Sequence, residues 1–284
     1  MKGWLKERLG ERWRRRIHAL SRLRWITKTR IIQAEGLPVR DHLRYILLDP
    51  EVESYTYRVA NIDGMLTTIA EATGTPVEEL RHYVAEADTD PELRDNLTRR
   101  LRWRFDVKHR PELANRLGWY VLVRALRPRL VVETGVYHGF GSLTLLRALE
   151  RNAADGSPGE LVSFDISEEA GSFVDRRRYP GWRHVVGETT EILRGSLDGR
   201  QIGAVFQDSN HSVAVQELEF GVALASPEPT LLLVDGSCGE SPVLEQLTRE
   251  RGGDYRRVRL GAADHWYQRG ALTFSLFRTA DENA

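Results

Sequence analysis

Hydrophobic positions change their spacing near residue 128, and this change divides the chain into two kinds of structure. Before it, apolar residues recur every three or four positions, which is the spacing of one face of a helix. After it, they gather in short runs rich in Val, Leu and Phe, separated by segments long enough for a crossover helix. We therefore predict an α-helical amino-terminal region followed by an α/β domain.

The downstream runs predict a seven-stranded sheet. Five strands should be parallel because helices can cross between them, whereas a short loop with Arg269-Gly270 joins the last two and predicts an antiparallel hairpin, the last strand reversed. The predicted strands are 130–134, 161–165, 182–187, 202–208, 230–235, 255–260 and 271–277.

Three domains follow from this pattern: a basic amphipathic helix at 1–31, a helical cap or lid at 32–112, and the α/β domain at 113–284. Within the cap we expect two short helices around Gly74-Thr75-Pro76 and another at 91–104. The second of the short helices is acidic, which disfavours contact with phosphates and hence sequence-specific binding of nucleic acid.

Charge is unevenly distributed along the chain. Lys and Arg total 41 and Asp and Glu total 41, yet residues 1–31 contain eleven Lys and Arg against two Glu. The apolar stripe of this segment could lie on an anionic membrane as a peripheral contact. The alternatives are that it docks on the acidic remainder of the chain, that it forms a homodimer, or that it is a solvated basic face.

Composition excludes several classes of protein. With 41% hydrophobic and 29% charged residues, the chain has the composition of a soluble globular protein. A single cysteine, Cys238, excludes an intramolecular disulfide and a Cys-rich zinc site. No apolar run approaches the roughly 18 residues of a membrane span, and the arginine-rich start is unlike a signal peptide. We expect a cytoplasmic protein.

Acidic residues stand at the ends of the predicted parallel strands, where open α/β sheets bind ligands. They are Glu133, Asp165, Glu188, Asp208 and Asp235. After the first strand, Gly135, Gly139 and Gly141 allow a tight turn before Ser142 begins a helix. This spacing is neither GxGxxG nor a P-loop. Because Glu133 would repel a polyphosphate, a cationic or amino-bearing ligand is favoured.

The segment ETGVYHGFGS and the acids that follow resemble the class I S-adenosylmethionine-dependent methyltransferases, over about residues 113–278. They resemble most the bacterial small-molecule O-methyltransferases. The resemblance implies a Rossmann-like sheet with S-adenosylmethionine as cofactor. It also implies that Asp165 binds the ribose and that Glu188 lies near the adenine. The residues implied around the methionine end are Glu133, Gly135, Tyr137, Gly139, Gly141 and Ser142, with Asp208 as a further contact.

The segment QDSNHSVAVQELEF resembles the part of such enzymes that lies beside the transferred methyl group. We predict His211 as the general base, because imidazole titrates near neutral pH, with Asp208 orienting it or holding substrate. The alternative is that His211 only caps a helix. The signature of methyltransferases that act on amino groups of nucleic-acid bases is absent, which favours an oxygen acceptor.

A divalent metal such as Mg²⁺ is not favoured. Some relatives hold one after strands four and five, but here Asp208 and Asp235 would lack the third ligand. His265 is expected in a surface loop, and no basic cluster activates Cys238. The resemblance further implies that helices before the first strand form a lid, in which Tyr55, Tyr57, Trp103 and Trp119 either line the pocket or form core.

The predicted function is O-methylation of a hydroxyl on a small molecule or glycoside, in natural-product or glycan biosynthesis. The alternative is a non-catalytic protein of the same fold that binds membrane or nucleic acid through its basic amino-terminal segment.

Overall fold

The computed structural model describes Val39, Arg40, Leu43 and the ranges 56–101, 112–197, 199–225, 230–235, 241–264 and 270–277. Contacts divide the chain into two units, and the elements described below belong to the unit formed by 57–101 and 110–284. The predicted basic helix, with its membrane or dimer contact, lies outside the described residues and stays a prediction. So do Tyr55, Trp103, Cys238 and His265. No described helix is long and apolar enough to cross a membrane.

The centre of this unit is a seven-stranded sheet with the order β3-β2-β1-β4-β5-β7-β6. β1 to β5 are parallel, whereas β7 runs antiparallel to both β5 and β6. The predicted mostly parallel sheet with a reversed last strand is therefore confirmed. The strands are β1 Leu130–Thr134, β2 Glu160–Asp165, β3 Arg183–Val186, β4 Ala204–Gln207, β5 Thr230–Val234, β6 Asp254–Leu260 and β7 Gly270–Phe277.

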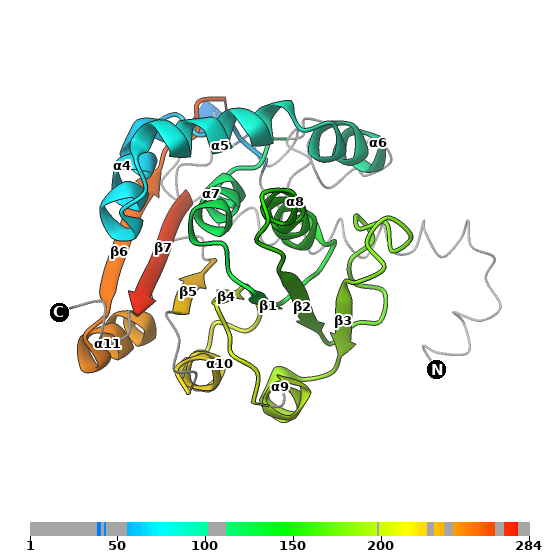
Figure 1. Cartoon of the computed structure of the whole chain (residues 1–284), viewed down its shortest axis with the longest axis vertical. Coiled ribbons are helices and arrows are strands. Elements are labelled where there is room, and N and C mark those ends of the chain that lie inside the picture. The colour runs from blue at the N-terminus through cyan, green and yellow to red at the C-terminus, as the bar shows by residue number, and fades with distance from the viewer. Residues whose placement is uncertain are drawn as a thin grey trace. The chain divides into compact units, whose positions relative to one another are not determined.

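Helices cover both faces of the sheet (Figure 1). α7 (Arg116–Leu126) and α8 (Phe140–Ala154) lie over one face. The other face carries α9 (Thr189–Leu197), α10 (Val213–Ala223) and α11 (Pro242–Arg251). Because side chains alternate along a strand, each strand supplies both faces. The second face forms a core that includes Leu130, Val132, Phe164, Val205, Leu232, Leu193 and Phe220.

The region before α7 contains α4 (Ile62–Thr73), α5 (Val77–Thr89), the short π-helix η1 (Glu92–Asn96) and α6 (Leu97–Leu101). α4 ends at Gly74, whose φ of 75° is a left-handed cap that a glycine adopts without steric cost. α5 lies over α7 and α8 as a further layer (Figure 1). The two short helices around Gly74 are confirmed, and they belong to the same compact unit as the sheet.

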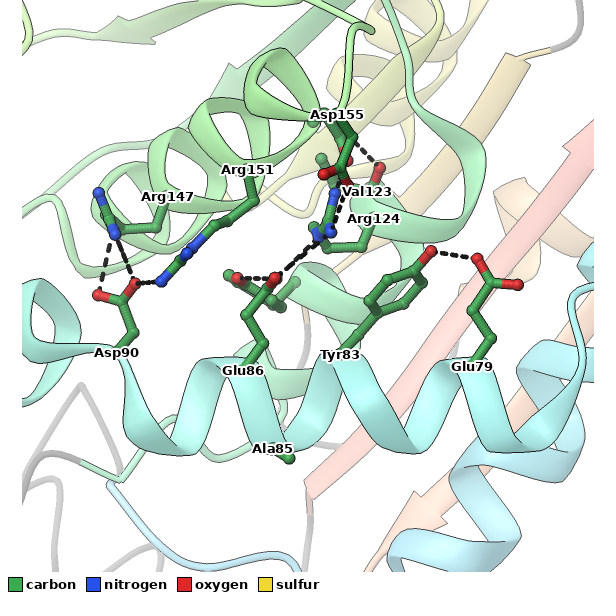
Figure 2. Close-up of polar contacts among 12 residues, drawn as sticks. Glu79, Tyr83, Ala85, Glu86, Asp90, Val123, Arg124, Arg147, Arg151 and Asp155 are labelled. Atoms are coloured by element: carbon green, nitrogen blue, oxygen red, sulfur yellow. Dashed lines mark hydrogen bonds and ion pairs between the residues drawn. The ribbon is translucent and has the colours of Figure 1, made fainter.

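The contact of α5 with α7 and α8 is strongly polar (Figure 2). Glu86 of α5 accepts hydrogen bonds from the Tyr120 hydroxyl at 2.6 Å and from Nε of Arg124 at 2.8 Å. Asp90 is fully buried and binds the guanidinium groups of Arg147 and Arg151 from α8. Because buried ions must be paired, these contacts fix where α5 can lie on α8. α8 begins at the glycine turn that follows β1.

Candidate functional site

The turn between β1 and α8 can be formed only by glycine at two of its positions. Gly135 has a φ of 84°, and a Cβ there would overlap the carbonyl oxygen of Asp208. Gly139 has a φ of 82°, and its Cβ would lie 2.8 Å from the Cα of Gly171. Both residues adopt a left-handed conformation that L side chains disfavour. The backbone of the turn is therefore pressed between the end of β4 and the loop after β2.

Asp165, the last residue of β2, holds this turn in place. Its Oδ2 accepts hydrogen bonds from the backbone N–H groups of Val136 at 2.8 Å and Tyr137 at 2.9 Å. Its Oδ1 accepts one from the N–H of Ser167 at 2.8 Å. A carboxylate has about four lone-pair sites, so the partly exposed Asp165 keeps capacity to accept from a ligand hydroxyl.

An aromatic wall borders the turn. Tyr137 has a φ of 50° and leaves 41% of its surface exposed. Its ring contacts the ring of His138, with centroids 3.7 Å apart, and His138 stacks on Phe173 at 5.5 Å. Backbone hydrogen bonds from Gly171 to Tyr137 and from Phe173 to His138 join the two loops. The ring of Tyr137 is thus partly exposed beside the turn.

Glu133 lies beneath the turn in a buried network. Its Oε2 accepts hydrogen bonds from the hydroxyls of Ser142 and Ser163, both at 2.6 Å. A Cβ at Gly141 would lie 2.7 Å from Oε1 of Glu133, so this glycine allows the close approach of α8. Burial raises the pKa of Glu133 to about 7, although the two hydroxyls oppose the shift. Glu133 and Ser142 are 1% and 0% exposed, and both therefore support the turn from within.

A pair of carboxylates closes the site at the ends of β4 and β5. Asp208 and Asp235 are hydrogen-bonded to each other, and the Asn115 amide also donates to Asp235. The loss of water around its carboxyl and the charge of Asp235 raise the pKa of Asp208 well above its usual value. The guanidinium of Arg116 lies 3.9 Å from Asp208. The raised pKa of Asp208 and the nearby charge of Arg116 allow the two carboxylates to lie side by side.

Glu133, Asp165 and Asp208 lie on one side of the sheet. Glu133 pairs with Ser163 and with Phe206, which stand two residues before Asp165 and Asp208, and side chains two residues apart share a face. Tyr57 and Trp119 are buried beside this region, 2% and 0% exposed. The charges of Asp235 and Arg116 reach the Tyr57 hydroxyl.

His211 contacts the side chain of Gln207. Its Nδ1 is 3.0 Å from Oε1 of Gln207, which is the last residue of β4 and fully buried. Because neighbouring residues of a strand point to opposite faces, Gln207 faces α10 while Asp208 faces α7. The hydrogen-bond partner that orients the imidazole is therefore Gln207, and the contacts of Asp208 are with Asp235 and Arg116. His211 itself is exposed at the start of α10.

Glu188 is exposed where α9 begins, and its carbonyl accepts hydrogen bonds from the N–H groups of Glu191 and Ile192. It thus stands beyond the carboxyl end of β3, where it was predicted. It is exposed, whereas Glu133 and the hydroxyl groups bound to it are buried.

Three residues of the site were not predicted: Asn115, Arg116 and Glu219. Glu219 of α10 is 1% exposed and accepts hydrogen bonds from Thr134 at 2.8 Å, Thr189 at 2.6 Å and Ser209 at 2.9 Å. One carboxylate thereby joins the segments that follow β1, β3 and β4. A cation in the first turn of a helix, where the dipole disfavours it, was the available signal for Arg116.

A family model described as a methyltransferase domain matches residues 132–234. This part of the chain is similar to a methyltransferase domain. It extends from β1 to β5 and contains the glycine turn and the converging carboxylates. The resemblance to class I S-adenosylmethionine-dependent methyltransferases, and the Rossmann-like fold it implies, are confirmed. No curated protein matches the sequence.

Solved structures with a similar fold include two O-methyltransferases. TomG from Streptomyces achromogenes, in complex with SAM, is 19% identical over 70% of this chain and 96% of that chain, with a TM-score of 0.47. The O-methyltransferase from Bacillus cereus, in complex with SAH, is 16% identical over 69% of this chain and 98% of that chain, with a TM-score of 0.48. Cofactor-bound Rv0187 from MTB is 20% identical over 57% and 77%, with a TM-score of 0.43.

Proposed function

We propose that the methyltransferase domain transfers a methyl group from S-adenosylmethionine to a hydroxyl oxygen of a small molecule or glycoside. The observation that carries this proposal is the convergence of Glu133, Asp165 and Asp208 around the turn at Gly135. Negative charge at the strand ends suits a ligand with a sulfonium and an ammonium group. The absence of a Cβ at Gly135 and Gly139 lets the turn pack against the end of β4 and the loop after β2, which fixes the backbone that would face such a ligand.

The cofactor would supply the methyl group on a positively charged sulfur. In the proposed site, Gly135, Tyr137 and Gly139 line the methionine end, and Asp165 accepts hydrogen bonds from the ribose hydroxyls. Glu188 lies near the adenine. The buried Glu133, Gly141 and Ser142 would hold the turn in the shape that this binding needs.

We assign the removal of the acceptor proton to His211. The amide of Gln207 fixes the tautomer of this imidazole, because Nε2 of Gln207 donates to the carbonyl of Asn210 at 3.1 Å and its Oε1 is left to face Nδ1. An oxygen that only accepts requires the proton on Nδ1 of His211. Nε2 then carries the lone pair that can take a proton from a hydroxyl. Asp208 would position the bound molecules.

A divalent metal such as Mg²⁺ is not favoured in the proposed reaction. Asp208 and Asp235 are the candidate ligands. The guanidinium of Arg116 already lies near Asp208, and the amide of Asn115 already donates to Asp235. The described residues contain no cluster of three or more His, Cys, Asp or Glu arranged to hold a metal ion. The affinity and turnover of the enzyme should therefore be the same in Mg²⁺ and in chelator.

Calorimetric titration with S-adenosylmethionine and S-adenosylhomocysteine tests the proposal. The intact protein should bind both, and Asp165→Asn should weaken binding by about tenfold or more, because hydrogen bonds to a charged acceptor are lost. Asp63→Asn is the matched control, since this carboxylate is 77% exposed on α4. Absence of binding to the intact protein contradicts the proposed function.

A further inference from the structure

Arg116 is a buried cation whose side chain is only partly satisfied by the protein. It is the first residue of α7, and its side chain is 9% exposed. The Nε atom is buried and has no hydrogen-bond partner among the described residues. The nearest carboxylate oxygen, Oδ2 of Asp208, lies 3.9 Å from Nη2, beyond hydrogen-bonding distance. Such a donor is costly to bury unless another group completes its bonding.

Two aromatic rings fix the position of this guanidinium. Its Cζ lies 4.9 Å from the centroid of Phe140 and 5.5 Å from that of Trp119. Trp119 is one turn further along α7, and Phe140 is the first residue of α8, directly after the glycine turn. Stacking on rings holds a planar guanidinium without using its N–H groups. The rings thus hold the group in one orientation while Nε keeps its N–H unpaired among the described residues.

The guanidinium lies in the crevice at the strand ends. Its charge acts on Glu133 and Asp208 and on the hydroxyl of Tyr57. Asp208 is meanwhile hydrogen-bonded to Asp235, and Asn115 donates to Asp235. The carboxylates on this side therefore have partners of their own, and none of them forms a hydrogen bond with Nε of Arg116. An acceptor brought by a ligand would complete the site.

We propose that Arg116 binds a carboxylate of the ligand that occupies this crevice. The inference rests on the proposed function, which gives this carboxylate two sources. One is the methionine carboxylate of the cofactor, and the other is an acidic acceptor molecule. The fork of N–H donors of an arginine matches the two oxygens of a carboxylate. The positive charge of Arg116 would also lie beside the four acids of the crevice, Glu133, Asp165, Asp208 and Asp235. A ligand that carries both a positive and a negative group would therefore fit best.

Binding of two nucleosides tests the proposal and separates the sources. S-adenosylhomocysteine carries the amino-acid carboxylate, whereas 5′-methylthioadenosine lacks it but keeps adenine and ribose. If the cofactor is the source, Arg116→Gln should lower the affinity for S-adenosylhomocysteine by about 10- to 100-fold. The affinity for methylthioadenosine should stay unchanged. The affinity of Arg116→Lys for S-adenosylhomocysteine should lie between those of the wild type and Arg116→Gln, because lysine keeps the charge but not the fork of N–H donors. Unchanged methylthioadenosine affinity also shows that the variant is folded.

If the acceptor is the source, both nucleosides should bind Arg116→Gln as they bind the wild type. In that case 3,4-dihydroxybenzoate, titrated into the complex with S-adenosylhomocysteine, should bind the wild type at least tenfold more tightly than Arg116→Gln. Catechol, which has no carboxylate, should not distinguish them. Arg129→Gln is the matched control, because Arg129 is exposed just before β1, at the opposite end of the strand from the crevice.

The proposal is overturned if Arg116→Gln alters neither the S-adenosylhomocysteine affinity nor the dihydroxybenzoate affinity relative to Arg129→Gln. It is equally overturned if Arg116→Gln lowers the affinity for methylthioadenosine and for S-adenosylhomocysteine to the same extent. Failure of the wild type to bind any nucleoside would instead reject the proposed function.

Discussion

The carboxylate of Asp90, at the end of α5, accepts hydrogen bonds from Nε of Arg147 on α8 at 3.1 and 3.2 Å to its two oxygens (Figure 2). Burial alone would raise the pKa of Asp90, but the bonds from Arg147 and from the N–H of Leu93 more than offset it and lower the pKa. This pair therefore favours the folded state above the ordinary pKa of an aspartate, and its contribution is lost as the pH falls below that value.

Removal of Asp90 should destabilise the protein strongly. Asp90→Ala leaves the Arg147 guanidinium buried without its main partner, which typically costs about 3–5 kcal/mol. Urea unfolding at neutral pH measures this change. Asp88→Ala is the control, because Asp88 is 49% exposed and pairs with Arg94 at the surface, where loss of an ion pair costs about 1 kcal/mol or less. If the two variants lose the same free energy of unfolding, the buried pair contributes no more to stability than the surface pair.

Gly135→Ala should abolish cofactor binding as well as reduce stability. The new Cβ would be strained by the left-handed backbone and would overlap the carbonyl of Asp208. Gly156→Ala separates the two effects, since Gly156 has a φ of 86° and nothing within 4 Å of its Cβ position. We expect Gly156→Ala to cost about 1 kcal/mol in unfolding free energy and to leave binding intact. Thermal unfolding and calorimetry with S-adenosylhomocysteine check both; intact binding by Gly135→Ala would contradict the proposed turn.

Stability should decrease as the pH rises from about 4.5 to about 7, in part because of Glu133. The ordinary pKa of the carboxyl is 4.5 and burial raises it to about 7 in the folded protein. In this range the unfolded chain releases the proton while the folded protein keeps it, so each rise in pH favours unfolding. The whole range corresponds to about 3 kcal/mol.

Glu133→Gln should remove that contribution and flatten the pH dependence of the unfolding free energy. Glu188→Gln, at an exposed position, removes the same charge and should keep the slope of the wild type. Denaturant unfolding across the pH range tests the pair of variants. A Glu133→Gln protein with an unaltered slope would mean that this carboxyl ionises as it does in the unfolded chain.

His211→Ala should lower turnover by about 10²- to 10⁴-fold, the usual contribution of a general base, and leave S-adenosylhomocysteine binding unchanged. Release of S-adenosylhomocysteine, measured with any phenol or glycoside that the wild type methylates, gives the rate. Gln207→Leu should lower the rate as well, because the imidazole loses the partner that keeps the proton on Nδ1. His82→Ala, in α5, is the control. Full turnover by His211→Ala would remove this residue from the reaction.

Sequence patterns located the strands well because burial on both faces produces short, continuous apolar runs. The runs at 130–134 and 161–165 coincide with β1 and β2 almost residue for residue. The acids at strand ends were recognisable for a related reason. A parallel sheet brings all its carboxyl ends to one edge, so position along the chain is sufficient to place Asp165 and Asp208.

The spacing of apolar residues could not identify the site residues that lie on helices. Arg116 and Glu219 lie in helices with strongly apolar neighbours, and their burial depends on how α7 and α10 cross the ends of the strands. A spacing of three or four residues indicates which side of a helix is apolar, but not which polar residue faces a strand end. His211 likewise contacts Gln207 and not Asp208, because neighbouring residues of a strand point to opposite faces. Which of the two residues faces α10 is known only once the register of β4 is known.

The position of β7 between β5 and β6 has a consequence for synthesis on the ribosome. β5 is complete at Val234, yet the strand that covers its open side begins at Gly270. Until those residues emerge, a nascent chain presents a bare row of backbone donors and acceptors on an apolar strand, which is the kind of surface that recruits chaperones or joins with other chains. Truncation before Gly270 should therefore give insoluble protein even though the family-matched segment is present in full.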